Sequence, residues 1–486
     1  MKMNNKLGKI IAYKKSFLIG FLSVMFLYAC VPTKAIKEED RSMPEQYENQ
    51  SSDSLNTAAT VKWRDFFSDP YLVSLIDSAL VNNQELNIML QRVSMAQNEI
   101  KVRKGEYLPF VNFYGGAEVE KVGEYTRNGA VEEGLNIRED ENFPDPLPNY
   151  TFGLSASWEL DVWKKLRNAK KSAVYEYLAS VEGKNFMVTN LVSEIADSYY
   201  ELLALDNQLV IIDQNLELQK NALTMVDLQK QAARATALAV KKFEAEVLKN
   251  KSHRYEIKQQ IVEVENKINF LLGKSPTPIQ RSTDDFINKT LDTIYTGVPS
   301  QLLQNRTDIR QAELELASAK LNIKVAKANF YPSIGIKAGI GLEAFNPRYL
   351  NAAPESLLYS VVGDVVGPLI NRNAIKAEYK NANSRQIQAV YEYEKSILNA
   401  FVEVSNQVSN INNLKMSYDL KKGQVNALTE SIDVAMLLFQ SARADYMEVL
   451  LTQRDALESK IELVETKKDQ MLAQVNMYRA LGGGWN

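Results

Sequence analysis

Two long proline-free stretches, with apolar residues at every seventh position, constrain this fold more than any other feature. No proline lies between residues 149 and 275, or between residues 369 and 486. The apolar positions of the first stretch are Val188, Ile195, Leu202, Leu209, Leu216 and Leu223, with Leu191, Leu205, Ile212 and Val226 between them. Those of the second are Ile397, Val404, Ile411, Tyr418, Val425, Ile432 and Phe439, with Leu414 and Leu428 between them. Heptad spacing sustained this far predicts coiled-coil packing rather than a buried globular helix.

The first stretch predicts a helix from about Trp163 to about Gln231, roughly 100 Å long at 1.5 Å per residue. The chain would then turn and run back from about Leu238 to Leu272. The second stretch predicts the same hairpin, with its turn near residues 441–445. A compact domain does not need helices of this length, so they indicate a protein that crosses a wide gap.

The two halves of the chain repeat one order of elements, which indicates an internal duplication. The segment Leu271–Lys274 lies 209 positions before the similar segment Ala480–Gly483. Tyr107–Pro109 lies 223 positions before Phe330–Pro332, so the first half carries a longer insert. Each half is predicted to contain a helix, two strands and a long helical hairpin.

Four segments alternate between apolar and polar side chains, as half-buried strands do. They are residues 107–122, 150–162, 332–345 and 357–369, and the alternation is cleanest in 151–162 and 333–344. Each is close to the ten residues that a tilted membrane strand needs. A soluble sandwich alternates in the same way. Four strands cannot close around a lumen, and lipid does not tolerate open sheet edges, so a membrane location requires oligomerisation.

The two connections between these strands differ in length and charge. Residues 123–149 are long and acidic, whereas residues 345–356 are shorter. Long external loops are normal for membrane barrels. Trp158 and Trp163 lie where strand would pass into helix. They suit an interfacial aromatic belt, or they are ordinary packing residues.

Residues 1–29 have the pattern of a secretory leader, with a basic start and an apolar run from 16 to 28 that is too short to span a bilayer. The run ends Leu27-Tyr28-Ala29-Cys30, and Cys30 is the single cysteine of the chain. This ending resembles the lipobox of bacterial lipoproteins, which implies lipid attached to Cys30. The alternative is an ordinary signal peptide with a chance cysteine. Residues 31 to about 60 are polar and contain Pro32 and Pro44, and they are expected to form an extended tether with little core of its own.

Composition excludes several classes of function. The formal net charge is -3, and the mature chain has no lysine- and arginine-rich run, which argues against nucleic acid as a partner. One histidine and one cysteine cannot supply a histidine–cysteine metal site, a redox pair or an internal disulfide. The sequence contains no phosphate-binding loop, dinucleotide fingerprint, nucleophile elbow or zinc-protease motif, so we expect no enzyme and no cofactor beyond the lipid on Cys30.

Three motifs carry a resemblance to a known family: Asn305–Glu313, Ala326–Ile334, and the ending Gln453–Leu457 with Tyr478–Trp485. With the lipobox and the duplication, the chain resembles the TolC-type outer membrane factor family, in its OprM-like lipoprotein branch. The resemblance implies an α+β membrane protein in the cell outer membrane. Three identical chains would close a 12-stranded β-barrel, continued by a long α-helical periplasmic barrel. It also implies a periplasmic adaptor, an RND-type inner-membrane pump and outer-membrane lipid as partners.

In this family the tips of the helical hairpins carry the gate, with a glycine in each turn and acidic residues just after it. The resemblance places the glycine positions at Ala233 and Ala442, so both tips depart from the family pattern. Alanine can remain helical where glycine favours a break, which leaves the turn conformation open. Glu448 matches a carboxylate of the periplasmic aperture, whereas Ala239 replaces a carboxylate that latches the closed state in TolC.

The other charged residues at the tips are weaker candidates. Arg234, Arg443 and Asp445 would contact the adaptor or act as latches by resemblance, or they are simply solvated charges. Glu448 could likewise be a solvated carboxylate, and His253 is expected to be a surface residue on the return helix. In a ring of three, Glu448 could favour cations or repel anions.

The resulting organisation has five parts. Residues 1–29 form a lipoprotein signal peptide, 30–68 an acylated tether, 69–275 the first repeat, 276–300 an equatorial linker and 301–486 the second repeat. By resemblance, the function is passive conduction of small molecules or drugs from a pump and adaptor to the exterior. Two alternatives stay open: a lipid-anchored coiled-coil scaffold without a channel, and an exit duct for protein or glycolipid.

Overall fold

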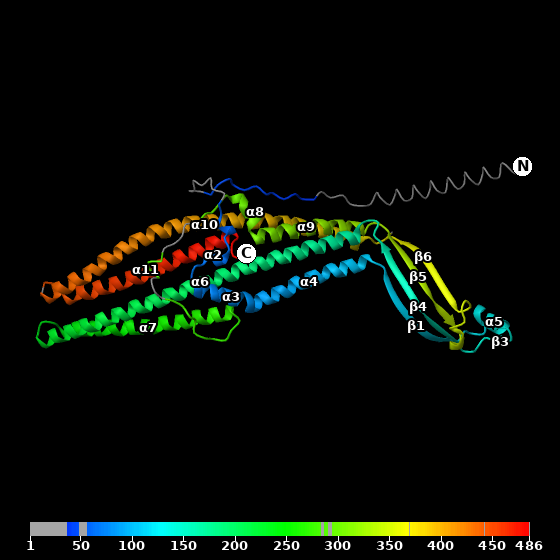
Figure 1. Cartoon of the computed structure of the whole chain (residues 1–486), viewed down its shortest axis with the longest axis horizontal. Helices are drawn as coiled ribbons and strands as arrows, with labels where there is room; N and C mark the ends of the chain where they lie inside the picture. Colours follow the sequence, from blue (N-terminus) through cyan, green and yellow to red (C-terminus); the bar gives the residue numbers. More distant parts are fainter. Residues whose placement is uncertain are drawn as a thin grey trace. The chain divides into compact units, whose positions relative to one another are not determined.

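A computed structural model describes residues 36–47, 56–282, 286–289, 294–368, 370–441 and 443–485 (Figure 1). The chain divides into two compact units, and segments from both halves of the duplication contribute to each. The strand unit contains residues 95–177 and 314–390 with the described residues up to Glu38. The hairpin unit contains residues 39–94, 178–313 and 391 onward. Cys30 and Ala442, both singled out by the sequence, lie outside the described residues.

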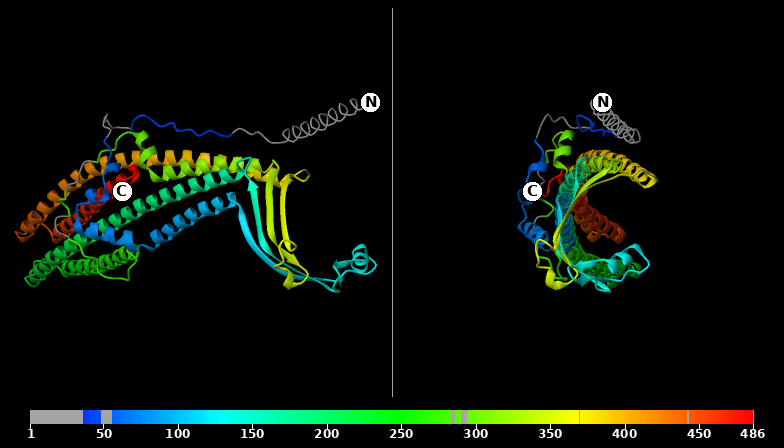
Figure 2. Two further views of the ribbon diagram at one scale, coloured as in Figure 1. Left: turned by 45° about the vertical axis from the view of Figure 1, so that its right-hand side comes forward. Right: turned by 90° about the vertical axis from the view of Figure 1, so that its right-hand side faces the viewer.

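The strand unit is built on an antiparallel four-stranded sheet in the order β1-β4-β5-β6 (Figure 2). Its strands are β1 (Phe110–Glu120), β4 (Leu147–Leu160), β5 (Ser333–Ala344) and β6 (Leu357–Val366). The register aligns the apolar positions across all four strands, as in the row Phe113, Leu154, Ile340 and Tyr359. One face of the sheet is therefore apolar, and the other carries small and charged side chains together with a few apolar ones, such as Tyr114 and Val362. This confirms the predicted alternation, because a slip of one residue would have mixed the two faces.

Several predicted strand ends are wrong by two or three residues. β1 begins at Phe110, where 107 was expected, and β6 ends at Val366, where 369 was expected. β4 begins at Leu147 and includes Pro148, which pairs with Val119. It ends at Leu160, where 162 was expected, because the Asp161 carboxylate turns away to accept hydrogen bonds from the backbone N–H groups of Leu166 and Arg167. Asp161 thereby satisfies free donors in the first turn of the next helix, and the strand cannot continue through it.

The long acidic connection between β1 and β4 is ordered rather than a plain loop. It contains α5 (Arg127–Gly134), which is capped by Thr126, and the short strands β2 (Asn136–Arg138) and β3 (Glu141–Asn142). The guanidinium of Arg138 lies 4.3 Å from the ring centre of Tyr349 in the second connection. These contacts hold the two connections of the strand unit together.

The helices follow the predicted duplicated order. The first half has α4 (Gln84–Tyr107), α6 (Lys165–Gln231) and α7 (Ala237–Leu271), and the second has α9 (Thr307–Ala328), α10 (Asn373–Gln440) and α11 (Tyr446–Leu481). Short helices precede each half: η1 (Ala58–Thr60), α2 (Trp63–Phe66) and α3 (Pro70–Asn82), then η2 (Pro299–Gln301) and α8 (Leu302–Asn305). Among the residues that the structure describes, no helix is both long and apolar enough to span a membrane.

Several of the predicted heptad positions lie in the core of the hairpin unit, whereas others, such as Ile411 and Val425, are only half-buried. Ile195, Leu202 and Ile212 on α6 are fully buried, and Val404 on α10 is buried as well. The return helices bury Ile257 and Ile268 on α7 and Val464 on α11. Packing between the helices of each hairpin, rather than helix propensity, therefore holds these long helices together.

The segment expected to be a bare tether contributes to the core. Tyr47 is buried and stacks on Phe401, with ring centres 5.5 Å apart. Trp63 and Phe67 are also buried, in and just after α2. The expectation of little core in residues 31 to about 60 was therefore wrong at Tyr47, because a single aromatic side chain in a polar segment can pack onto a neighbouring helix.

Candidate functional site at the hairpin tips

The first tip breaks the helix at an alanine in a left-handed conformation. α6 ends at Gln231, and Ala233 has φ +61°. The N–H of Arg234 donates to the carbonyl oxygen of Gln229 at 2.8 Å, and that of Ala233 to Lys230 at 2.9 Å. This is the hydrogen-bond pattern of a helix end that glycine usually occupies. The substitution of alanine therefore does not keep the chain helical here, although the left-handed backbone costs about 1–2 kcal/mol for a residue with a Cβ.

The second tip contains the same closing hydrogen bond. The N–H of Arg443 donates to the carbonyl oxygen of Leu438 at 2.8 Å, at the positions related to Arg234 and Gln229 by the duplication. The start of the return helix differs between the tips. Thr236 caps α7 by accepting a hydrogen bond from Ala239, whereas Asp445 precedes α11 without a side-chain cap.

An apolar cluster joins the two hairpins just above their turns. It is formed by side chains from α6, α7, α10 and α11: Ala222, Val226, Ala239, Phe243, Ala435, Phe439 and Val449. Ala239 is completely buried in this cluster. Its small side chain packs against apolar side chains of both hairpins, and the absence of a carboxylate latch at this position stays a prediction.

The charged tip residues are all exposed to solvent. They are Arg234, Arg443, Asp445 and Glu448. Within the part of the chain that is described, no ion pair joins any two of them. Their predicted roles at an adaptor contact or an aperture stay predictions.

Exposed leucines surround the charged residues, although no exposed apolar side chains were predicted at the tips. They are Leu228 and Leu238 at the first tip and Leu437, Leu438 and Leu451 at the second. Their exposure could have been predicted from the sequence, because these leucines lie outside the heptad positions that form the helix contacts. Clustered exposed apolar side chains mark surfaces that contact another protein.

A buried arginine network at the base of the second hairpin explains the most specific sequence motif. Arg306 is 4% exposed, and its guanidinium donates to Asp308 and Glu403, each at 2.6 Å, and to the carbonyl oxygen of Ala480 at 3.0 Å. The motif Asn305–Glu313 therefore anchors the end of α11 to the end of α8, to the start of α9 and to α10. Its role is structural rather than chemical.

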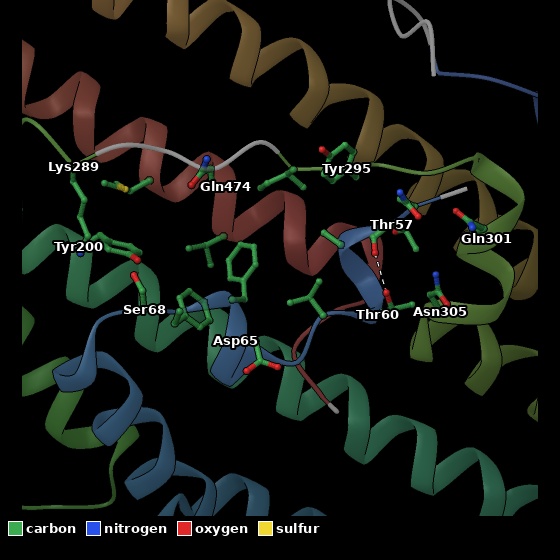
Figure 3. A pocket seen from close by; sticks show the side chains of 18 of the residues that line it. Thr57, Thr60, Asp65, Ser68, Tyr200, Lys289, Tyr295, Gln301, Asn305 and Gln474 are labelled. Atoms are coloured by element: carbon green, nitrogen blue, oxygen red, sulfur yellow. Dashed lines mark hydrogen bonds between the residues drawn. The ribbon is translucent and has the colours of Figure 1, made fainter. Parts of the chain in front are cut away.

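A cavity of about 700 Å³ lies beside this base, within the hairpin unit (Figure 3). Figure 3 shows Asp65, Ser68, Tyr200, Lys289 and Asn305 around it, drawn from α2, α6, α8 and the equatorial segments. The lining mixes polar and apolar side chains without a nucleophile next to a base. The described residues contain no group of three or more histidines, cysteines, aspartates or glutamates that could hold a metal ion.

The sequence and fold of this chain match those of known proteins. The "Outer membrane efflux protein" family matches residues 75–274 and 298–483, one match for each half of the duplication. The chain belongs to this outer membrane efflux family.

Several members of known name or structure are similar over nearly the whole chain. The pyoverdine export outer membrane protein OpmQ of Pseudomonas aeruginosa is 27% identical over 95% of each chain. The cation efflux system protein CusC of Escherichia coli is 26% identical over 96% of this chain and 98% of its own. The open state of the Neisseria gonorrhoeae MtrE outer membrane channel superimposes with a TM-score of 0.82, at 21% identity, over 94% of this chain and 99% of MtrE.

These findings confirm the family resemblance, the fold class and the location predicted from the sequence. The chain is an outer-membrane channel component of a tripartite efflux system. Members of the family are transport channels. A coiled-coil scaffold without a channel would leave the matched four-stranded sheet unexplained.

Proposed function

We propose that three copies of this chain, each anchored by lipid at Cys30, form one closed passage through the outer membrane and into the periplasm. The hairpin tips receive a periplasmic adaptor, and an RND-type inner-membrane pump delivers small molecules or drugs to the passage. The chain itself acts as a passive duct, without catalysis and without a cofactor.

The open edges of the sheet carry this proposal. In the order β1-β4-β5-β6, the outer edges of β1 and β6 have no ladder partner among the described residues. The four strands are 10–14 residues long and present one continuous apolar face. Lipid offers no hydrogen bonds to a free sheet edge, so β1 of one copy must pair with β6 of the next.

An exposed apolar stripe on α4 supports assembly with neighbouring copies. Ile88, Met95 and Val102 repeat every seven residues and are 56%, 62% and 52% exposed in the single chain. Tyr391 and Leu398 on α10 are spaced in the same way and are also exposed. A heptad stripe on a helix buries itself against another helix, and a neighbouring copy would supply that helix.

The polar face of the sheet suits a water-filled interior. Ser155, Gly339 and Ser360 form one row across β4, β5 and β6. The ammonium of Lys337 on this face lies 3.3 Å from the carboxylate of Asp364. Small and charged side chains on the inner face are typical of barrels that conduct solutes.

The comparisons leave the cargo open. OpmQ is named for the export of pyoverdine and CusC for the efflux of cations, so ducts of one fold serve unlike cargoes. Selection would then take place in the pump, and Glu448 would at most bias the charge that passes the aperture. The alternative cargo class is a protein or glycolipid, because one duct can serve several pumps.

Planar-bilayer conductance tests the proposal, provided that the aperture can be opened. Ala239→Asp places a carboxylate in the buried apolar cluster at the tips and should separate the hairpins, which raises single-channel conductance several-fold. Ala237→Asp, exposed on the same helix, is the matched control and should behave as the unaltered chain. A heat-resistant trimer that conducts in no variant would contradict the proposed passage.

A further inference from the structure

A second cavity, of about 580 Å³, lies in the hairpin unit between α10, α11 and the equatorial residues 287–289, 294 and 296. Lys289 and Gln474 border both this cavity and the one shown in Figure 3. The residues of the second cavity are far apart in sequence. We call it the lysine cavity, because four lysines line it: Lys289, Lys415, Lys422 and Lys467.

The charges of the lysine cavity are strongly unbalanced. Lys415 and Lys422 lie two helical turns apart on one face of α10, and Lys467 faces them from α11. Asp419 is the single carboxylate among the described residues that line it. Lys289 has its own counter-charge, since its ammonium lies 3.6 Å from Asp69. Among the described residues, no carboxylate lies within ion-pair distance of the other three lysines.

Lys467 shows the imbalance most clearly, because it is only 5% exposed. Its ammonium donates to the carbonyl oxygen of Lys289 at 2.6 Å and lies 5.1 Å from the ring centre of Tyr418. Burial, with the nearby charge of Lys422, lowers the pKa of this amine. A buried ammonium is costly without an opposite charge, and here an oxygen dipole and a ring face stand in for one.

The remaining wall accommodates more than a simple ion. Asn412 and Gln470 bring side-chain amides to the lining, and Val408, Ile411 and Met477 form an apolar side. The cavity is much larger than one phosphate group, so an organic group could lie along the apolar side while the lysines hold the anion.

We propose that the lysine cavity binds a phosphate dianion borne on a small organic group. Lys415 and Lys422 are exposed to solvent and Lys467 is buried, and together their three ammonium groups match a dianion better than a single carboxylate. Lysine binds phosphate as a compact point charge. Lys415 and Lys422 hold the phosphate, and Lys467 supplies the buried charge behind them. The site regulates or stabilises the base of the hairpins and takes no part in conduction.

Calorimetric titration of the intact protein in detergent with glycerol 3-phosphate tests this, with inorganic phosphate in a parallel arm. Lys415→Gln and Lys422→Gln should each weaken binding about tenfold, the loss expected for one charge-assisted hydrogen bond. Lys468→Gln is the matched control, because Lys468 neighbours Lys467 on α11 but does not line the cavity. It should leave binding unchanged, and added salt should weaken binding to the unaltered chain.

The two arms identify the source of the phosphate. Tighter binding of glycerol 3-phosphate supports an organic phosphate, whereas equal binding supports phosphate recognition but overturns the organic group. Asp292 follows Lys289 closely in sequence and lies outside the described residues. If the unaltered chain binds neither ligand and Asp292→Asn binds both, the Asp292 carboxylate is the anion that the lysines bind, and the proposal is wrong. Absence of binding in all variants overturns it as well.

Discussion

The side-chain amide of Asn83 donates a hydrogen bond to the carbonyl oxygen of Leu271 at 2.9 Å, and so ties the start of α4 to the end of α7. The second repeat makes the same connection with Arg306 and Ala480, at the positions related by the duplication. Beside each pair, a glycine with positive φ faces a carbonyl oxygen: Gly273 faces Asn82, and Gly482 faces Asn305. Each hairpin is therefore fastened at its base by one side chain and one glycine.

Loss of the Arg306 connection should lower the free energy of unfolding more than loss of the Asn83 connection. Arg306→Met leaves the carboxylates of Asp308 and Glu403 without their buried partner, so we expect the free energy of unfolding to fall by about 3–5 kcal/mol. Thermal unfolding of the detergent-solubilised protein measures this. Arg454→Met, at an exposed pair with Asp455, should change stability by less than about 1 kcal/mol. If Arg306→Met and Arg454→Met lowered the free energy of unfolding equally, the buried arginine network would stabilise the fold no more than an exposed ion pair does.

The glycine at the same base gives a second prediction. Gly482 has φ +96°, and a Cβ placed there would lie 2.6 Å from the carbonyl oxygen of Asn305. Gly482→Ala should therefore destabilise by more than the roughly 1–2 kcal/mol of left-handed strain alone. Gly423→Ala is the matched control. Nothing lies within 4 Å of a Cβ at Gly423, inside α10, so this change should stabilise by about 1 kcal/mol.

The repeated fold could be predicted from the sequence because its signals are local. Heptads, alternation and the two offsets placed the first long hairpin, the turn of the second and the four strands to within a few residues. The ends that were missed depend on contacts between distant residues. Asp161 looked like a continuation of the strand, and only the turn onto Leu166 and Arg167 shows it to be a helix cap.

The tip turn offers a change that should stabilise the protein. The left-handed backbone of Ala233 is strained, and glycine would not have this strain. Glycine also gives the unfolded chain more conformational freedom, which offsets part of the gain. Ala233→Gly should therefore raise the free energy of unfolding by about 0.5–1 kcal/mol. Ala237→Gly, in the first turn of α7, should lower stability by a similar amount. Hydrogen exchange at the tip and chemical unfolding would report both. A loss of stability in Ala233→Gly would contradict the left-handed turn.

Asp197 on α6 should make stability depend on pH. Burial raises its pKa to about 6, against the opposing charges of Arg479 and Lys267, and its Oδ1 atom is buried without a hydrogen-bond partner among the described residues. Because the folded state binds this proton more tightly than the unfolded state, stability from this group falls as pH rises from about 4 through 6. Asp197→Asn should therefore flatten this slope and stabilise the protein at pH 7 by at most about 3 kcal/mol.

Glu217, exposed on the same helix and not among the charges that shift the pKa of Asp197, provides the control, since Glu217→Gln should leave the slope intact. Unfolding in denaturant at several pH values from 4 to 8 measures both variants. An unchanged slope in Asp197→Asn would assign the pH dependence to other groups.

The sites were less predictable than the fold. The tip charges could be named from the resemblance, but their exposure and lack of mutual contacts follow only from the structure. The lysine cavity gave no signal at all in sequence. Lys289, Lys415 and Lys467 are separated by long stretches of chain, and only the packing of α10 on α11 brings them together.

The central claim is that neighbouring copies close the sheet, and disulfide trapping tests it most directly. Phe113→Cys on β1 is combined, in turn, with single cysteines along β6, and the protein is oxidised in its membrane. Disulfides need Cα atoms within about 7 Å and side chains on the same face. We predict a covalent trimer with a cysteine at Tyr359, Val361 or Val365 on the apolar face, and none at Ser360 or Val362 on the polar face. Monomers at every position, from protein that is folded in the outer membrane, would contradict a closed passage.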